Sequence, residues 1–182
     1  MASYSIVDIF RDEGLVKKPD LHLFILKSLF GKISFKNKTV VDVGSGNGKY
    51  SFFAANSGAK KVYSLEPEAD GSGYGNMMEK YRNVMKKYDL GNLELKKETL
   101  SSFIQDKSGV LYPEIVMLIN SVNHIDEDSV ERIHDDKKSL INYLLIFKEL
   151  FDFVPDGCEI IITDSPRSNF LSKLGLINPI YP

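Results

Sequence analysis

Three glycines lie within five positions at residues 44 to 48, directly after the apolar run VVDV at residues 40 to 43. Gly44 can take backbone angles that are closed to other residues, and Gly46 lets the main chain approach a ligand closely. Gly48 allows the next helix to pack against the strand. Such a turn is typical of α/β sheets that bind nucleotide-like ligands at the carboxyl ends of their strands.

An acid ends the next apolar run, in VYSLEPE, about 18 residues beyond the glycine turn. The carboxylate of Glu66 could accept hydrogen bonds from both hydroxyls of a ribose; the alternative is a surface acid after a strand. The dinucleotide fingerprint is G-x-G-x-x-G and receives a pyrophosphate, whereas residues 44 to 48 read G-x-G-x-G with Asp42 two positions earlier. A carboxylate there opposes a pyrophosphate and favours a ligand with an ammonium group and a positively charged sulfur.

On these motifs the chain resembles the class I S-adenosylmethionine-dependent methyltransferases over about residues 38 to 165. Residues 40 to 48 match the first motif of that family, and Glu66 matches its ribose-binding acid. The resemblance implies that S-adenosylmethionine is the cofactor and S-adenosylhomocysteine the product. The cofactor-binding residues that it implies are Asp42, Gly44, Ser45, Gly46, Gly48, Glu66, Pro67, Glu98, Thr99 and Asn120.

The resemblance also assigns a part of the cofactor to each residue. The backbone of residues 44 to 48 and Asp42 would hold the methionyl part, Glu66 the ribose, and Asn120 the floor near the sulfonium. The adenine would be framed by Pro67, Glu98 and Thr99. Glu98 has an alternative role as a charge at a helix N-terminus, and Asn120 as a turn residue.

Methyl transfer from a sulfonium is a direct displacement, so the protein mainly aligns the acceptor and excludes water. A hydroxyl acceptor usually needs a base. His124 follows the fourth predicted strand and is the candidate base; its alternative role is to orient the loop. Asp164 ends the fifth predicted strand and is a candidate for orienting the substrate. The other histidines have no ligand cluster around them, so no metal site is predicted.

Charge and composition limit the classes of molecule that the protein is expected to bind. The formal charge is −2, so no basic field for nucleic acid is expected. The family's DNA amino-methylating members carry an Asn/Asp-Pro-Pro-aromatic motif after the fourth strand, which residues 120 to 123 lack. A small molecule or a glycan precursor is therefore the predicted acceptor. Neither a secretory signal nor a membrane span is present in the pattern, so a cytoplasmic protein with no membrane partner is expected.

Two other functions stay open. A non-catalytic relative could bind the cofactor and serve as an interaction or regulatory module. A nicotinamide-dependent oxidoreductase is disfavoured by the glycine spacing.

Apolar runs and turn residues predict the elements that position these side chains. Strands are expected at residues 39–43, 61–65, 93–97, 114–120 and 159–163, and crossover helices at residues 50–57, 70–88, 99–106 and 128–153. This alternation predicts a doubly wound, mostly parallel α/β sheet with helices on both faces, the Rossmann-like methyltransferase fold.

The chain is expected to form one methyltransferase-like domain over residues 1–182. Residues 1–36 would be an N-terminal helical cap, with a helix that begins near Asp20 as its capping residue. Residues 37–165 would be the cofactor-binding core, and residues 166–182 an incomplete C-terminal part with a short helix at 169–174. An uncovered fifth strand leaves an unpaired edge, so we expect the natural chain to continue beyond Pro182 or a second copy to cover that edge.

Overall fold

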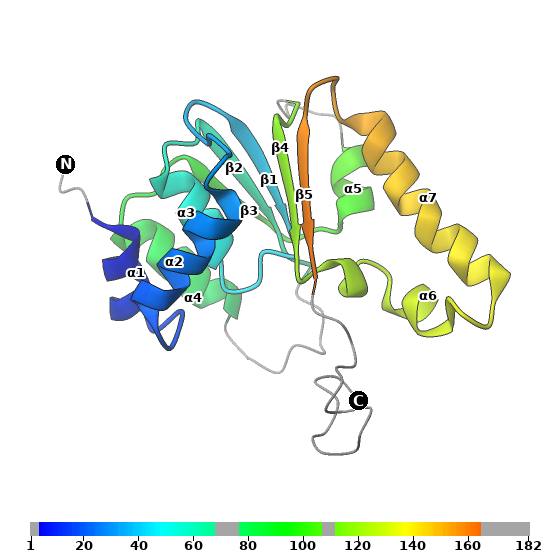
Figure 1. Cartoon of the computed structure of the whole chain (residues 1–182), viewed down its shortest axis with the longest axis horizontal. Coiled ribbons are helices and arrows are strands. Elements are labelled where there is room, and N and C mark those ends of the chain that lie inside the picture. The colour runs from blue at the N-terminus through cyan, green and yellow to red at the C-terminus, as the bar shows by residue number, and fades with distance from the viewer. Residues whose placement is uncertain (1–3, 68–76, 107–111, 165–182) are drawn as a thin grey trace, which may run out of the picture.

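The computed structural model describes residues 4–67, 77–106 and 112–164 of the chain. Its centre is a parallel sheet of five strands in the order β3-β2-β1-β4-β5 (Figure 1). The strands are β1 (Thr39–Val43), β2 (Lys61–Leu65), β3 (Leu93–Lys96), β4 (Ile115–Ile119) and β5 (Glu159–Thr163). The predicted doubly wound α/β fold is confirmed, and β3 and β4 are slightly shorter than expected.

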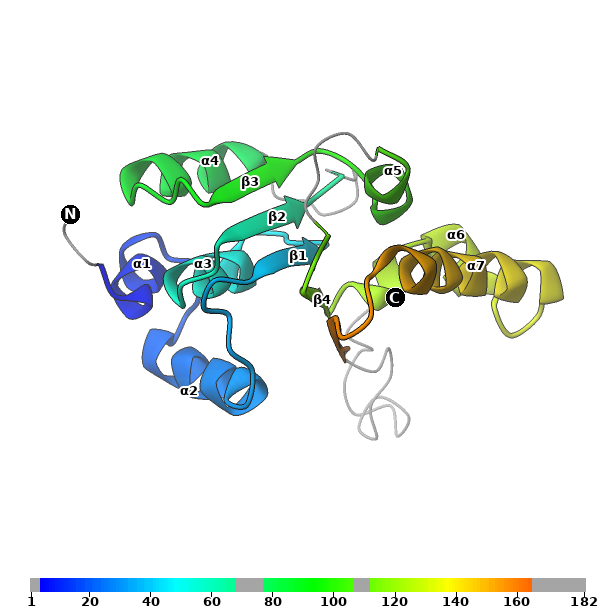
Figure 2. The ribbon, with the colours of Figure 1, turned by 90° about the horizontal axis from the view of Figure 1, so that it is seen from above.

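Helices cover both faces of the sheet, as Figure 2 shows from above. One face carries α1 (Ile6–Asp12), α2 (Pro19–Phe30), α3 (Lys49–Asn56) and α4 (Met77–Lys87), and the other carries α5 (Leu100–Gln105) and α7 (Lys137–Phe153). The short helices η1 (Val122–His124) and α6 (Glu127–Arg132) connect β4 to α7. Each face has its own cluster of buried apolar side chains. Within the described ranges, no helix has the length and apolar composition needed to cross a membrane.

The strand order reverses between β1 and β4, which lie side by side at the centre. Asp42 pairs in register with Ser64 of β2 and Met117 of β4, so the end of β1 has a strand on each side. All residues of β1 and β4 are buried, because helices cover both faces there. By contrast, β5 pairs with β4 alone in the described sheet and is only partly buried. A second copy over this edge stays a prediction.

The N-terminal helices differ from the expectation. Helix α2 begins at Pro19, and Asp20 lies inside its first turn instead of capping it, because proline suits the first helical position. Helix α1 was not expected. Its sequence signal is Ser5, whose hydroxyl accepts the backbone N–H of Asp8 at 3.2 Å.

The segment expected as one helix at residues 128–153 is divided. Asp126 caps α6 by accepting the N–H of Ser129 at 3.1 Å, and Asp136 caps α7 by accepting the N–H groups of Lys138 and Ser139. Each capping aspartate starts a new helix, which is why the chain turns between them. The short helix expected at residues 169–174 lies outside the described residues.

Gly48 is the residue directly before α3, and it packs against the buried side chains beneath the glycine turn. Its φ is +83°, and a Cβ there would contact the ring of Tyr81 and lie 2.7 Å from Cε2 of Phe52. Both rings are fully buried, so neither can move aside easily. The close packing of α3 and α4 under the turn therefore depends on this glycine.

We predict that Gly48→Ala lowers the free energy of unfolding by about 3 kcal/mol, from backbone strain and overpacking together. Gly157 is the matched control, because it has the same φ of +83° and nothing within 4 Å of a Cβ. Gly157→Ala should cost only about 1 kcal/mol, from backbone strain alone. Chemical denaturation measures both; equal losses would contradict the packing explanation.

Candidate functional site

A cavity of about 690 Å³ opens at the carboxyl ends of the strands. Its walls come from the turn after β1, the end of β2, the start of α5 and the segment after β4. Met77 of α4 and Ile146 of α7 complete them. Parallel strands bring their carboxyl ends to one edge of the sheet, and the reversal between β1 and β4 leaves a crevice there. The cavity therefore lies where this topology is expected to bind a ligand.

The glycine turn is folded onto the end of β2. Gly44, Gly46 and Gly48 all have positive φ, at +67°, +53° and +83°. The N–H groups of Gly44 and Ser45 both donate to the carbonyl of Leu65, at 2.9 and 3.0 Å. These bonds fix the turn against the neighbouring strand, with its backbone exposed to the cavity at Gly44 and Gly46.

Glu66 connects the two strand ends. Its Oε2 accepts the N–H of Gly46 at 2.8 Å, and the side chain is 8% exposed where it meets the cavity. A buried carboxylate with a backbone donor is held in one orientation. The acid predicted to bind a ribose is therefore also a structural partner of the glycine turn.

The residues directly after β4 form the floor of the cavity. A Cβ at Gly44 would lie 2.7 Å from Cβ of Ser121, so only glycine lets these two segments approach so closely. Asn120 has a left-handed backbone with φ of +54°, and its N–H donates to the carbonyl of Thr163 at 2.8 Å. Both Asn120 and Ser121 line the cavity.

Most of the predicted site residues come together around this cavity. The ones that line it are Gly44, Gly46, Glu66, Pro67, Glu98, Thr99, Asn120 and His124. Thr99 also caps α5, by accepting the N–H of Ser102 at 3.2 Å. Glu98 lies 3.2 Å from the ammonium group of Lys96, so it has an ion-pair partner besides its place in the wall.

Other predicted residues lie outside the lining. Ser45 and Gly48 are buried within the turn. Asp164 is exposed after the end of β5 and does not reach the cavity wall. His124 is therefore the candidate catalytic residue that the structure brings to the cavity. Its segment is held by Tyr143 of α7, whose hydroxyl donates to the carbonyl of Val122 at 2.9 Å.

Asp42 was predicted to help hold the methionyl part of the cofactor. In the structure it lies beneath the turn. It is 1% exposed, and its Oδ2 accepts the hydroxyl of Ser51 at 2.5 Å. Ser51 in turn accepts from Ser64 at 2.8 Å, and Ser64 shares a 2.6 Å hydrogen bond with Tyr81. Asp42 therefore lies in a buried chain of hydrogen bonds and is not among the residues that line the cavity. Its predicted role in holding the methionyl part stays a prediction.

Sequence reasoning missed several residues of the cavity wall. They are Met77, Leu100, Ser101, Ser121, Ile125, Asp126 and Ile146. Ile146 belongs to the apolar stripe of α7, and that stripe alone did not show which side chain would reach the site. Asp126 carried a clearer signal, because an aspartate three residues before a serine is a common helix start.

The chain resembles known methyltransferases in short segments of sequence and in its fold. No family model matches the chain. Protein arginine N-methyltransferase 1 of Caenorhabditis elegans is 62% identical over 32 residues, which are 18% of this chain and 9% of that protein. Histone-arginine methyltransferase CARMER of Drosophila ananassae is 53% identical over 38 residues, 21% of this chain and 7% of that protein. The matched segments thus span less than a tenth of these curated relatives.

Solved structures resemble a much larger part of the chain. A Methanococcus maripaludis protein, provisionally named an S-adenosyl-L-methionine-dependent methyltransferase, has a TM-score of 0.56 at 12% identity, over 88% of this chain and 65% of that one. Coclaurine N-methyltransferase, solved with N-methylheliamine and S-adenosylhomocysteine, has a TM-score of 0.55 at 13% identity, over 80% and 35%. At such identities the likeness establishes the fold.

The chain has the class I methyltransferase fold.

In this methyltransferase fold, the charged wall of the cavity is acidic. Among the described lining residues, three carry carboxylates, namely Glu66, Glu98 and Asp126, and none is a lysine or arginine. Beneath the wall, burial raises the pKa of Asp42 to about 6, although the hydrogen bond from Ser51 opposes the shift. The described wall thus presents carboxylates with no lysine or arginine among its residues, which favours a cationic ligand.

The raised pKa of Asp42 predicts a pH-dependent stability. A carboxyl whose pKa is higher in the folded than in the unfolded chain stabilises the fold most at low pH, and that contribution is lost as the pH rises through about 6. At pH 8, Asp42→Asn should therefore raise the free energy of unfolding by about 3 kcal/mol, since asparagine can still accept from Ser51.

At pH 5 the gain should fall to about half of that value, because much of the buried carboxyl is then protonated in the wild type. Denaturant unfolding of both proteins across this range measures the difference. A gain that did not change between pH 5 and pH 8 would show that charge burial is not its cause.

Proposed function

We propose that the chain is the cofactor-binding core of an S-adenosylmethionine-dependent methyltransferase that acts on a small-molecule or glycan-type acceptor. The observation that carries this proposal is the meeting of the Gly46 N–H and the Glu66 carboxylate in the wall of one cavity. A backbone turn without side chains leaves room for a ligand, and an adjacent buried acid suits ribose hydroxyls. The acidic wall suits a sulfonium and an ammonium group.

The described residues fit each part of that cofactor. The backbone at Gly44 and Gly46 would face the methionyl part, and Glu66 the ribose. Pro67 and Thr99 would border the adenine, and Asn120 would lie on the floor near the sulfonium. Bound S-adenosylmethionine supplies an activated methyl group, so the protein has to align the acceptor and exclude water.

His124 is the proposed base for an acceptor that must lose a proton. It lines the cavity from η1, beyond the floor residues Asn120 and Ser121. For a neutral amine acceptor no base is needed before the transfer, and His124 would then only orient the substrate.

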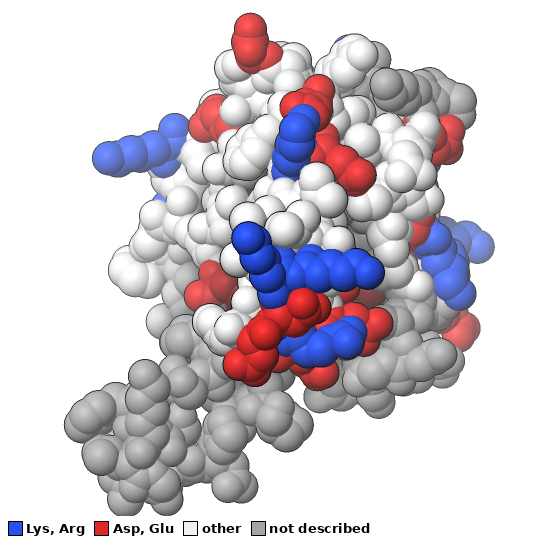
Figure 3. All heavy atoms as spheres, turned by 90° about the vertical axis from the view of Figure 1, so that its right-hand side faces the viewer, with Lys and Arg blue, Asp and Glu red and all other residues white. Residues whose placement is uncertain are grey.

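The mixed charges on the outer face that carries α7, visible in Figure 3, give no directed attraction for a polyanion such as nucleic acid.

A second acceptor class has one specific observation in its favour. The curated matches are to proteins named as arginine methyltransferases, with high identity over a short segment. A guanidinium acceptor would also suit the carboxylates of the wall. A non-catalytic module that only binds the cofactor would show the same affinity for it without turnover.

Calorimetric titration with S-adenosylmethionine, S-adenosylhomocysteine and NAD tests the cofactor class. The two sulfur compounds should bind and NAD should not. Transfer of a labelled methyl group to amine, hydroxyl, glycan and arginine-peptide acceptors then tests catalysis. Binding without any turnover would favour the module, and binding of NAD alone would refute the proposal.

We predict that Glu66→Gln weakens binding of S-adenosylmethionine by about 1 to 3 kcal/mol, because a charged acceptor for ribose hydroxyls is lost. Glutamine retains one oxygen for the N–H of Gly46, so the thermal midpoint should change little. Adenosine alone should lose the same affinity, whereas methionine should lose none. An unchanged affinity for adenosine would refute the ribose assignment.

We also predict that His124→Ala lowers turnover of a hydroxyl acceptor by about 10²-fold or more, the usual contribution of a general base. Affinity for S-adenosylmethionine should stay within about twofold, since the base acts on the acceptor. His134→Ala is the matched control, because His134 is an exposed histidine outside the cavity wall. Full activity of His124→Ala would leave His124 with a structural role only.

A further inference from the structure

Asn120 has a left-handed backbone. Its φ of +54° lies in the left-handed region, which is uncommon for residues other than glycine and which asparagine adopts more readily than most of them. Two contacts are in place. Its N–H donates to the carbonyl of Thr163 at 2.8 Å, and its Nδ2 donates to the hydroxyl of Tyr50 at 3.5 Å. The first contact comes from the sheet, and the second from helix α3.

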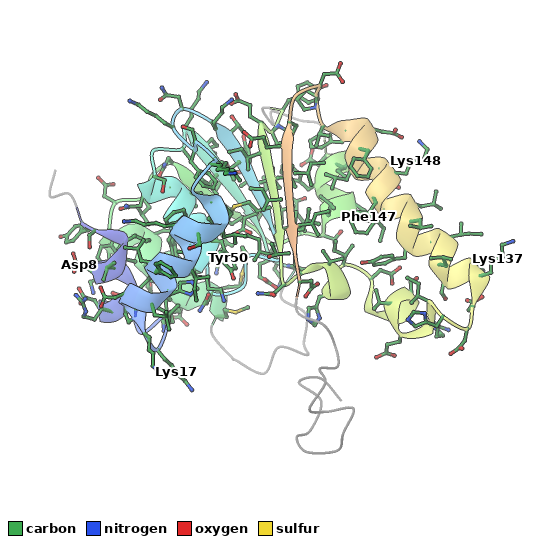
Figure 4. The ribbon with its side chains drawn as sticks, in the orientation of Figure 1. Asp8, Lys17, Tyr50, Lys137, Phe147 and Lys148 are labelled. Atoms are coloured by element: carbon green, nitrogen blue, oxygen red, sulfur yellow. The ribbon has the colours of Figure 1, made fainter. Side chains whose placement is uncertain are left out.

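Tyr50 is itself fixed by the N-terminal helices. Its side chain is buried on the face of the sheet that α1 to α4 cover (Figure 4). The His22 ring of α2 lies 6.3 Å from the Tyr50 ring, and the Phe10 ring of α1 packs edge-on against His22 at 5.4 Å. A line of packed rings therefore runs from α1 through α2 to Tyr50, and the Tyr50 hydroxyl meets a residue of the cavity floor.

The protonated phenol of Tyr50 suits a lasting hydrogen bond with Asn120. Burial and the charge of Asp42 raise the pKa of Tyr50, so the phenol stays neutral over the range in which the protein would work. The ammonium group of Lys49 lies 4.9 Å from the centre of the same ring, and this cation–π contact also restricts the orientation of the ring.

We propose that Tyr50 is a positioning residue that holds Asn120 in its left-handed conformation and connects the N-terminal helices to the cavity floor. Its effect on catalysis rests on the proposed methyltransferase function. Its effect on the conformation of Asn120 does not, and the two can be measured separately.

Hydrogen exchange of the protein without ligands tests the conformational effect. Tyr50→Phe removes only the hydroxyl and should speed exchange of the amides of Asn120 and His124 by about fivefold, the effect of one modest hydrogen bond. Tyr88→Phe is the matched control, because the Tyr88 hydroxyl is bonded to Glu13 at 3.0 Å, in contact with α1 and away from the cavity. It should leave those two amides unchanged.

A double-mutant cycle makes the test specific. Glycine adopts positive φ without help, so Tyr50→Phe should have little further effect on His124 exchange in an Asn120→Gly background. An equal effect in both backgrounds would overturn the proposal, as would unchanged exchange in Tyr50→Phe or an equal change in Tyr88→Phe.

The catalytic readout follows with S-adenosylmethionine and an acceptor. Tyr50→Phe should lower kcat by about fivefold and leave the KM for S-adenosylmethionine within about twofold, because the floor faces the transferred methyl. A rise in KM with unchanged kcat would overturn the catalytic part. If exchange responds as expected but the wild type binds no S-adenosylmethionine, the proposed function fails and the positioning of Asn120 stands.

Discussion

One hydrogen bond, from the N–H of Gly46 to Oε2 of Glu66, joins the turn after β1 to the end of β2. The turn has three positive φ angles and no side chain to anchor it at the glycines, so its shape depends on what its amides bond. Leu65 accepts two of them, and Glu66 accepts the third. Without that carboxylate, the N–H of Gly46 would lose this partner, and only the two bonds to Leu65 would join these amides of the turn to β2.

The layer beneath the turn makes this shape costly to change. Asp42, Ser51, Ser64 and Tyr81 form a continuous buried chain of hydrogen bonds between β1, β2, α3 and α4. A buried carboxylate lowers stability near neutral pH, yet it ties together four elements that meet under Gly48. The site thus combines a rigid polar support below with a backbone surface free of side chains above, an arrangement suited to preorganised binding.

Much of this could be predicted from the sequence, because the signals are local. Apolar runs, most of them continuous, predicted all five strands, and the glycine spacing and Glu66 located the cavity. The burial of Asp42 beneath the turn could not be predicted, because β1 is buried on both faces and its apolar pattern does not tell which residues face α3 and which face α5. The structure separates them, with Val41 and Val43 in the α5 and α7 cluster and Val40 in the other.

The rest could not be predicted because it depends on contacts between distant segments. The link from His22 through Tyr50 to Asn120 joins three elements that are far apart in sequence, and none of these residues forms a motif with the others. The division of residues 128–153 was more accessible, since two capping aspartates marked the helix starts. Sequence patterns thus located the glycine turn better than they located its supports.

The two halves of the cavity are held by different means, which bears on what each can recognise. The half at β1 and β2 is fixed by neighbouring strands, whose register leaves little freedom. The half at His124 and Asp126 follows β4 as a short helical segment, tied to α7 by the hydroxyl of Tyr143. Connecting segments vary more between related proteins than strand ends do. A fixed half suits a ligand common to many proteins, and an adaptable half suits one that differs between them. If the proposed function holds, we expect acceptor choice to be set after β4.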